Sequence, residues 1–179
     1  ITVNPVNDVP VVTVPLSAQT MNEGPGAAKV ITGIRVSDVD FEELGAADLT
    51  VTLSVPVNDG ALNVAAGVAG GVTNITGNGT ETVKLVGRIA QINATLAAAA
   101  GVTYTVPNGD FNVLNNGGPV ALTIATSDEG RTGTGTVVTV SGLVPITVNA
   151  INDDPTITAP APTPASALVV DEDTPVEFS

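Results

Sequence analysis

Short runs in which apolar and polar residues alternate recur along this chain at close spacing. Residues 49–55 (LTVTLSV) alternate most cleanly, and a period of two is typical of a β-strand with one buried face. The same kind of pattern predicts further strands at residues 9–14, 29–36, 61–64, 80–86, 102–106, 120–126 and 137–148. These strands dominate the chain.

One segment has a different period. In residues 89–100 the apolar side chains of Ile89, Ile92 and Leu96 follow a helical spacing, which predicts a short helix that Gly101 ends. Residues 41–47 are expected to form an acidic loop and residues 107–118 a polar one, because both are rich in residues that favour turns. About seven strands with one short helix indicate an all-β fold, an antiparallel Ig-like β-sandwich.

A ten-residue pattern occurs twice, as ITVNPVNDVP at residues 1–10 and as ITVNAINDDP at residues 146–155. In each copy a strand end runs into Asn-Asp and a stiffening Pro, which is typical of tandem domains. We therefore expect residues 1–8 to be the last strand and linker of a preceding repeat. Residues 9–153 would be one complete repeat, and residues 154–179 a Pro/Ala-rich linker with the first strand of the next.

Composition narrows the partners that this chain can have. Aromatic residues are only 2% of the sequence, so the core must be aliphatic. There are 18 acidic and 5 basic residues, too few bases for a nucleic-acid or anionic membrane surface, and a divalent cation is the expected partner. The absence of Cys fits a secreted or surface protein of bacteria, and the longest apolar run, residues 96–102, is too short to span a bilayer.

Acidic side chains are expected to collect at the two ends of the sandwich, because successive strands run in opposite directions. The upper end, where the chain enters, would gather Asn7, Asp8, Asp38, Asp40 and Asp128. The lower end would gather Glu23, Asp59, Asn152 and Asp153. Crowded carboxylates repel one another unless a hard cation lies among them, and Ca²⁺ takes six to eight oxygen ligands. The alternative is that these residues only form solvated turns, which Asp and Asn favour.

The order of these motifs resembles that of cadherin-like, Ig-like repeats, which recur in tandem in giant bacterial adhesins and extracellular matrix proteins. The similarity rests on Asn-Asp-x-Pro at a strand exit, Glu23 after the first strand, Asp38-Val39-Asp40 after the second and Asp128 in a later loop. It implies that the upper set holds Ca²⁺ at one joint, and that Glu23, Asn152 and Asp153 serve the next joint. Pro5 and Ala150 stand where cadherin linkers carry an acidic residue, so fewer ions per joint are expected.

These features predict a structural extender or adhesion repeat of an extracellular protein, with neighbouring repeats or identical subunits as partners. Catalysis is not expected, because the chain has no His or Cys and its Ser residues have no evident base. Two alternatives remain: a filament or matrix subunit that polymerises by donating the strand at residues 168–179, and a carbohydrate- or protein-binding module. Of three Asn-x-Thr triplets, at Asn74, Asn78 and Asn93, we expect Asn93 to bond locally.

Overall fold

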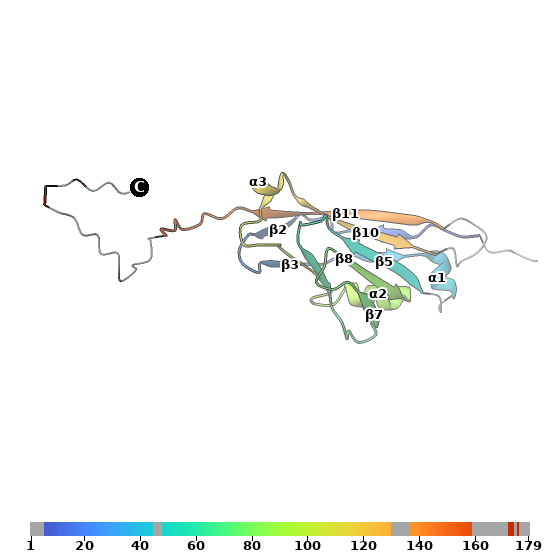
Figure 1. The fold of residues 1–179 in the computed structure, drawn as a ribbon. Coiled ribbons are helices and arrows are strands. Elements are labelled where there is room, and N and C mark those ends of the chain that lie inside the picture. The colour runs from blue at the N-terminus through green and yellow to red at the C-terminus, as the bar shows by residue number, and fades with distance from the viewer. Residues whose placement is uncertain (1–5, 45–47, 130–136, 159–171, 174, 176–179) are drawn as a thin grey trace, which may run out of the picture.

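The structure of this chain is a computed structural model that describes residues 6–44, 48–129, 137–158, 172–173 and 175. The described body is elongated, with α1 at one end and α3 at the other, and the chain leaves it beyond β11 at the α3 end (Figure 1). Residues 1–5 of the predicted preceding repeat, and most of the strand predicted at 168–179, lie outside the described residues.

The described residues form eleven strands and three short helices. The strands are β1 (Val11–Thr13), β2 (Gln19–Asn22), β3 (Ala28–Ile31), β4 (Arg35–Ser37), β5 (Leu49–Ser54), β6 (Ala61–Val64), β7 (Asn74–Thr76), β8 (Thr82–Gly87), β9 (Val102–Thr105), β10 (Val120–Ser127) and β11 (Thr139–Asn149). The helices are α1 (Val39–Leu44), α2 (Ile89–Leu96) and α3 (Val113–Asn116). The mostly-β class is therefore confirmed, whereas the expectation of about seven strands and one helix is wrong.

The strands form a six-stranded sheet in the order β2-β11-β10-β5-β8-β7, a three-stranded sheet in the order β3-β9-β6, and the pair β1-β4. Nearly all neighbouring strands are antiparallel, but β2 runs parallel to β11, with Gln19 opposite Ile146. The predicted wholly antiparallel arrangement is wrong at this point. The reason is that β2 continues in the direction of β1 and pairs with the last strand instead of folding back as a hairpin.

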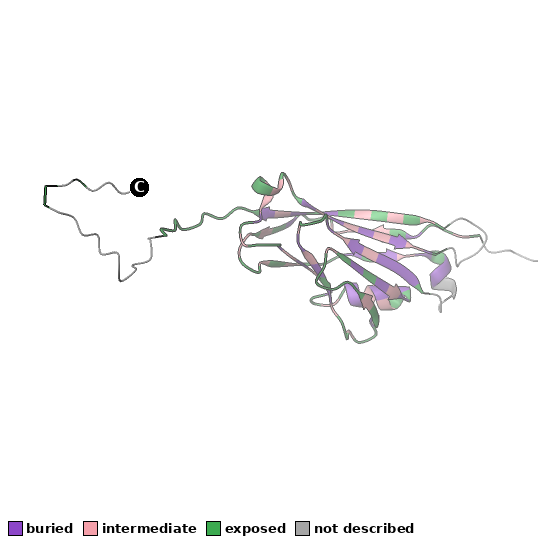
Figure 2. Ribbon diagram, viewed as in Figure 1, coloured by how far each residue is buried: buried purple, intermediate pink, exposed green. Residues whose placement is uncertain are grey.

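The core is aliphatic, as composition predicts. Its buried hydrophobic side chains include Phe41, Tyr104 and Phe111, and all the others are Val, Ile or Leu. Figure 2 shows the burial concentrated in the central strands. β10 buries every second side chain, and its buried hydrophobic residues join those of β5, α2 and the second sheet in one core cluster. Each fully buried aliphatic side chain contributes about 1.5–3 kcal/mol to stability, so this cluster holds the sheets together.

Several elements differ from the sequence-based prediction for local reasons. The strand expected at residues 29–36 divides into β3 and β4 because Gly33 adopts φ +87°, a conformation that breaks an extended run. α1 begins at Val39 and takes in residues 41–44 of the expected acidic loop. The polar loop contains α3, which Asn112 caps through hydrogen bonds from the backbone N–H groups of Leu114 and Asn115. The predicted helix at residues 89–100 is confirmed as α2, although it ends at Leu96.

Candidate functional site

The upper end of the domain brings together the five residues that the sequence places there. Asp38 follows β4, Asp40 lies in α1, and Asp128 follows β10. The incoming chain lies against them, because Asn7 Nδ2 donates to Asp128 Oδ2 at 2.6 Å. Next to it, the Asp8 backbone N–H donates to Asp40 Oδ2 at 2.6 Å. Residues far apart in the sequence therefore meet beside the incoming chain.

Asp38 occupies this position because it caps a helix. Its Oδ1 accepts hydrogen bonds from the backbone N–H of Asp40 at 3.0 Å and of Phe41 at 3.2 Å, which makes it the N-cap of α1. The cap explains why an oxygen-bearing residue stands here, but it uses only one oxygen. The other oxygen, Oδ2, is buried and has no hydrogen-bond partner, and the whole residue is 2% exposed.

The electrostatics of this end are unfavourable to three ionised groups. Asp38, Asp40 and Asp128 are all buried. Burial raises the pKa of Asp38 above its ordinary value, and the negative charges of Asp40 and Asp128 raise it further, against the lowering effect of the two backbone hydrogen bonds. A buried carboxylate oxygen without a partner is costly, so a proton or a cation at Asp38 would stabilise this cluster.

A second buried oxygen without a hydrogen-bond partner is Oγ1 of Thr126. Thr126 lies on β10 two residues before Asp128, so the two side chains point to the same side of the extended chain. Sequence reasoning did not identify Thr126. The signal was available, since a Thr at an inward position of an alternating strand is a polar group in an apolar row.

The acidic cluster is close-set but is not preformed around an ion. Among the residues that the structure describes, no group of three or more His, Cys, Asp or Glu side chains is arranged to hold a metal. The carboxylate of Asp40 is turned to the Asp8 N–H, and that of Asp128 to Asn7 and to the Val138 N–H at 3.2 Å. Each of these carboxylate oxygens has two lone pairs, so an N–H hydrogen bond leaves it capacity to coordinate a cation.

The lower end gathers its predicted residues only in part. Glu23 lies at the chain exit, where Oε1 accepts from the Ile151 N–H at 2.6 Å and Oε2 from Asn112 Nδ2 at 2.6 Å. Asn152 and Asp153 follow directly on the exit chain and are exposed. Asn112, which sequence reasoning missed, thus links α3 to Glu23 while it caps that helix.

Asp59 is held to the same end of the domain by different contacts. Its Oδ2 accepts from Asn116 Nδ2 at 3.4 Å, and its backbone carbonyl accepts from the Tyr104 hydroxyl at 2.6 Å. Within the described part of the chain, no hydrogen bond joins Asp59 to Glu23, Asn152 or Asp153. The four lower residues therefore share an end of the described body without forming one cluster.

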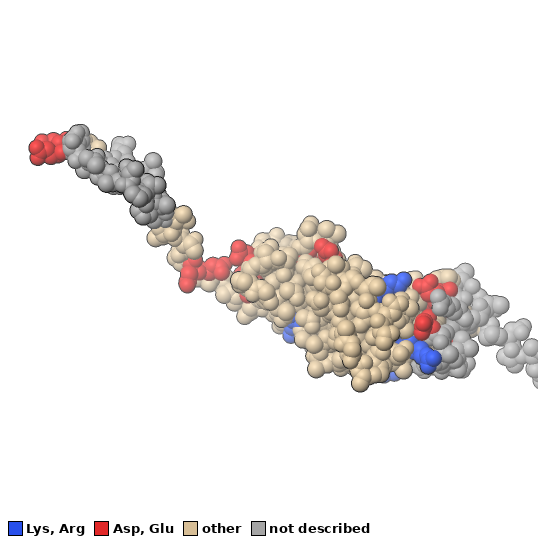
Figure 3. All heavy atoms as spheres, turned by 60° about the horizontal axis from the view of Figure 1, so that its bottom comes forward, with Lys and Arg blue, Asp and Glu red and all other residues tan. Residues whose placement is uncertain are grey.

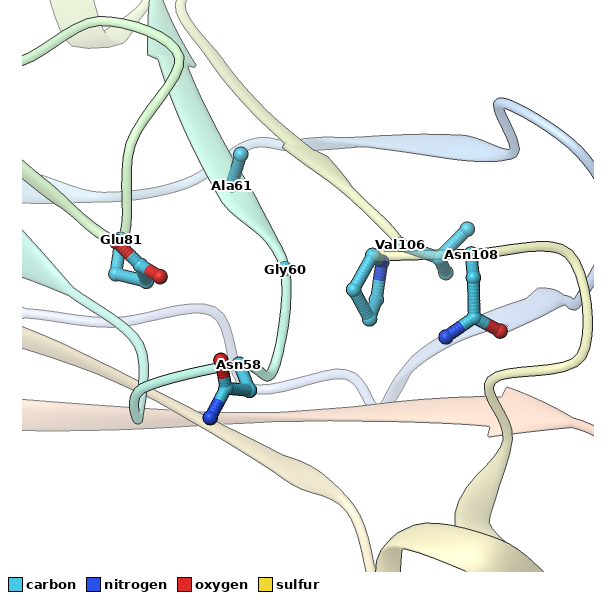
Figure 4. Close-up of a pocket in the computed structure, with 7 residues that line it drawn as sticks. Asn58, Gly60, Ala61, Glu81, Val106 and Asn108 are labelled. Atoms are coloured by element: carbon cyan, nitrogen blue, oxygen red, sulfur yellow. The ribbon is translucent and has the colours of Figure 1, made fainter.

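The structure also has an open hollow of about 470 Å³ on its side. Figure 4 shows that its lining residues come from the turn before β6, the start of β8 and the segment after β9. They are Asn58, Gly60, Ala61, Glu81, Val106, Pro107 and Asn108. None of these side chains is aromatic, so the hollow offers no stacking platform for a sugar ring.

Among the described residues, no helix has the length and apolar character needed to cross a membrane. No protein-family model, curated protein or solved structure matches the chain, so the comparisons assign it to no family.

Proposed function

We propose that this chain is an extender repeat of a bacterial surface or secreted protein, and that calcium stiffens the joints between its repeats. The observation that carries the proposal is the contact between the incoming linker, Asn7 and Asp8, and a buried acidic cluster with an unpartnered oxygen on Asp38. A cation bound there would hold residues of the linker and of the domain body in one coordination sphere.

The mechanism is mechanical. Without an ion, the buried carboxylates of Asp38, Asp40 and Asp128 repel one another and weaken the hold on the linker. With an ion, the unpartnered oxygen of Asp38 gains a positive charge beside it, and Ca²⁺ suits the site because it accepts flexible sets of six to eight oxygens. Extracellular calcium modules bind at roughly 10⁻⁴–10⁻³ M, so the joint would respond to calcium outside the cell.

A cadherin-like, Ig-like sandwich is the arrangement that we propose for the fold. Its support is the division of the first extended segment between two sheets, with β1 paired to β4 and β2 paired to β11. A segment shared in this way ties the layers together at the edge where the last strand leaves. The chain thus enters at one end and leaves at the other, as an extender requires.

The test is thermal unfolding of the full chain in EDTA and in millimolar calcium, alongside the double variant Asp38→Ala/Asp40→Ala. At free calcium 100-fold above Kd a site adds about 2.7 kcal/mol, which corresponds to a rise of about 5–10 °C in Tm for a domain of this size. The double variant should lose that rise. The matched control Glu81→Ala/Asp110→Ala removes two acids outside the cluster and should retain it.

An unchanged Tm in the native chain would reject calcium at the joint. The strand-donation alternative would then be tested by asking whether the full chain forms fibres and whether deletion after Pro155 abolishes them. An equal calcium response in the native chain and the Asp38→Ala/Asp40→Ala variant would show that an ion binds elsewhere.

A further inference from the structure

Because the joint sequence occurs at both ends of the repeat, one structure displays both halves of a joint. In register, Ile151 corresponds to Val6, Asn152 to Asn7 and Asp153 to Asp8. At its exit end, the repeat binds the Ile151 N–H through Glu23. At its entry end, it binds the next two positions of the pattern, the Asn7 side chain through Asp128 and the Asp8 N–H through Asp40.

Combining the two halves, we propose that consecutive repeats abut directly, with the α3 end of one docked on the α1 end of the next copy. This inference rests on the tandem arrangement of the proposed function, but not on calcium. The last hydrogen bond to one repeat is at Ile151 N and the first backbone hydrogen bond to the next would be at Asp153 N. Two residues span at most about 7 Å.

That short span limits the gap between the domains. The Glu23 carboxylate of one repeat and the Asp40 carboxylate of the next copy would lie no more than about 12 Å apart, because each bonds its backbone N–H at 2.6 Å. Side chains that project from the two ends must then meet. The joint therefore has no free linker in which the repeats could swing.

The chain beyond the joint agrees with this register. Residues 156–160 read TITAP and match VVTVP at residues 11–15, directly after the joint Pro in both copies. Val12 packs partly buried against the core, whereas its counterpart Ile157 is 94% exposed. Ile157 thus has the sequence of a first strand but is not covered by any of the described residues, and a second copy of this repeat is the occupant that fits.

Both end faces carry exposed apolar side chains beside their acids. Leu114 and Val57 lie at the lower end, next to the contacts of Asn112 and Asp59, and Val39 and Val137 lie at the upper end, next to Asp38 and Asp128. Figure 3 shows acidic atoms gathered at both ends of the described body, with few along its middle. The contact would therefore bury apolar groups and bring two acidic rims together, which is where a cation has most effect.

The experiment uses the full chain with residues 11–155 duplicated in place. Since the protein has no Cys, spin labels can be attached through Thr20→Cys in the first copy and Thr139→Cys in the second. Both sites are exposed, and they lie toward the two ends that would meet. Pulsed electron paramagnetic resonance should then show one narrow distance in calcium.

Two variants of the duplicated chain test the cause of that distance. Insertion of Gly-Ser-Gly-Ser between Ile151 and Asn152 at the internal joint should lengthen the distance by up to about 14 Å and broaden it. Glu23→Ala in the first copy should broaden it, whereas the matched control Glu81→Ala should not. A native distribution as broad as that of the insertion variant would overturn the proposal, and so would a narrow distance that neither variant changes.

The outcome is separable from that of the calcium proposal. A narrow distance in both EDTA and calcium, without any calcium effect on Tm, would support abutting repeats and reject calcium. A broad distance distribution together with a clear rise of Tm in calcium would reject abutting repeats and support calcium binding.

Discussion

Replacing Asp38 by Asn changes the charge of the buried cluster without removing the helix cap. Asn keeps the Oδ1 acceptor that receives the N–H groups of Asp40 and Phe41, and Asn and Asp are about equally good N-caps. The substitution places an amide where the unpartnered Oδ2 lies, and this amide is close to the negative charges of Asp40 and Asp128. It therefore isolates the electrostatic contribution of one carboxylate.

EDTA and calcium should shift the stability of Asp38→Asn relative to the native chain in opposite directions. Leaving a buried polar group unsatisfied costs about 1–3 kcal/mol, so in EDTA Asp38→Asn should stabilise the chain by about 1 kcal/mol, or about 2–4 °C in Tm. In calcium at 100-fold above the native Kd, the native chain gains about 2.7 kcal/mol. If the variant binds calcium 100-fold more weakly, it gains only about 0.4 kcal/mol.

The assay is calorimetric unfolding of the native chain and Asp38→Asn across a calcium titration, with Asp110→Asn as the control at an exposed site. The order of stability should invert: the variant more stable in EDTA, the native chain more stable in calcium. A variant that is less stable in EDTA would refute the argument from buried repulsion. A parallel calcium response in both proteins would refute Asp38 as a ligand.

Three further predictions follow from single sites. Because burial raises the pKa of Asp38, its carboxyl binds a proton more tightly in the folded state. The stabilising contribution of this proton is complete below the ordinary pKa of 3.8 and is lost as pH rises through the raised pKa. In EDTA the advantage of Asp38→Asn over the native chain should therefore shrink as pH is lowered from 7 towards 4, as followed by thermal unfolding; a constant difference would contradict it. Asn93 was expected to bond locally, but it binds both the N–H and the C=O of buried Val36, 57 residues away, at 3.0 and 2.8 Å. Asn93→Ala should therefore cost about 2–3 kcal/mol in urea unfolding, whereas Asn74→Ala on an exposed strand should cost almost nothing. Gly60 has φ +118°, and an added Cβ would lie 2.4 Å from a backbone oxygen of β9, so Gly60→Ala should destabilise by at least about 2 kcal/mol; a loss below 0.5 kcal/mol, roughly that of an ordinary surface change, would show that the turn can relax.

Local structure followed from the sequence where one signal dominates. The period of two located β5 to within a residue and β6 at its observed bounds, because alternation directly encodes which side chains face the core. The helical spacing located α2 for the same reason. Where a single backbone conformation or cap decides, as at Gly33 between β3 and β4, the pattern of apolar residues carried no warning.

The candidate site was predictable at the upper end and less so at the lower. Alternating strand directions were enough to place Asp38 and Asp128 at the end where Asn7 enters, even though Asn7 and Asp128 are 121 residues apart. That argument needs only the direction of the strand next to each residue, and it therefore held although the predicted number of strands was wrong. It could not reveal that Glu23 is engaged by Ile151 and Asn112, because these bonds depend on how α3 packs.

The sequence by itself therefore determined the class of fold, the aliphatic core, the repeated ten-residue pattern and the residues that carry oxygens at the two ends of the body. These follow from periodicity and composition, which are properties of neighbouring residues. Only the tertiary structure decided that β2 lies parallel to β11 and that one oxygen of Asp38 is buried without a partner. Strand partners and burial arise from contacts between distant segments, and their free energies are set by packing that no local pattern records.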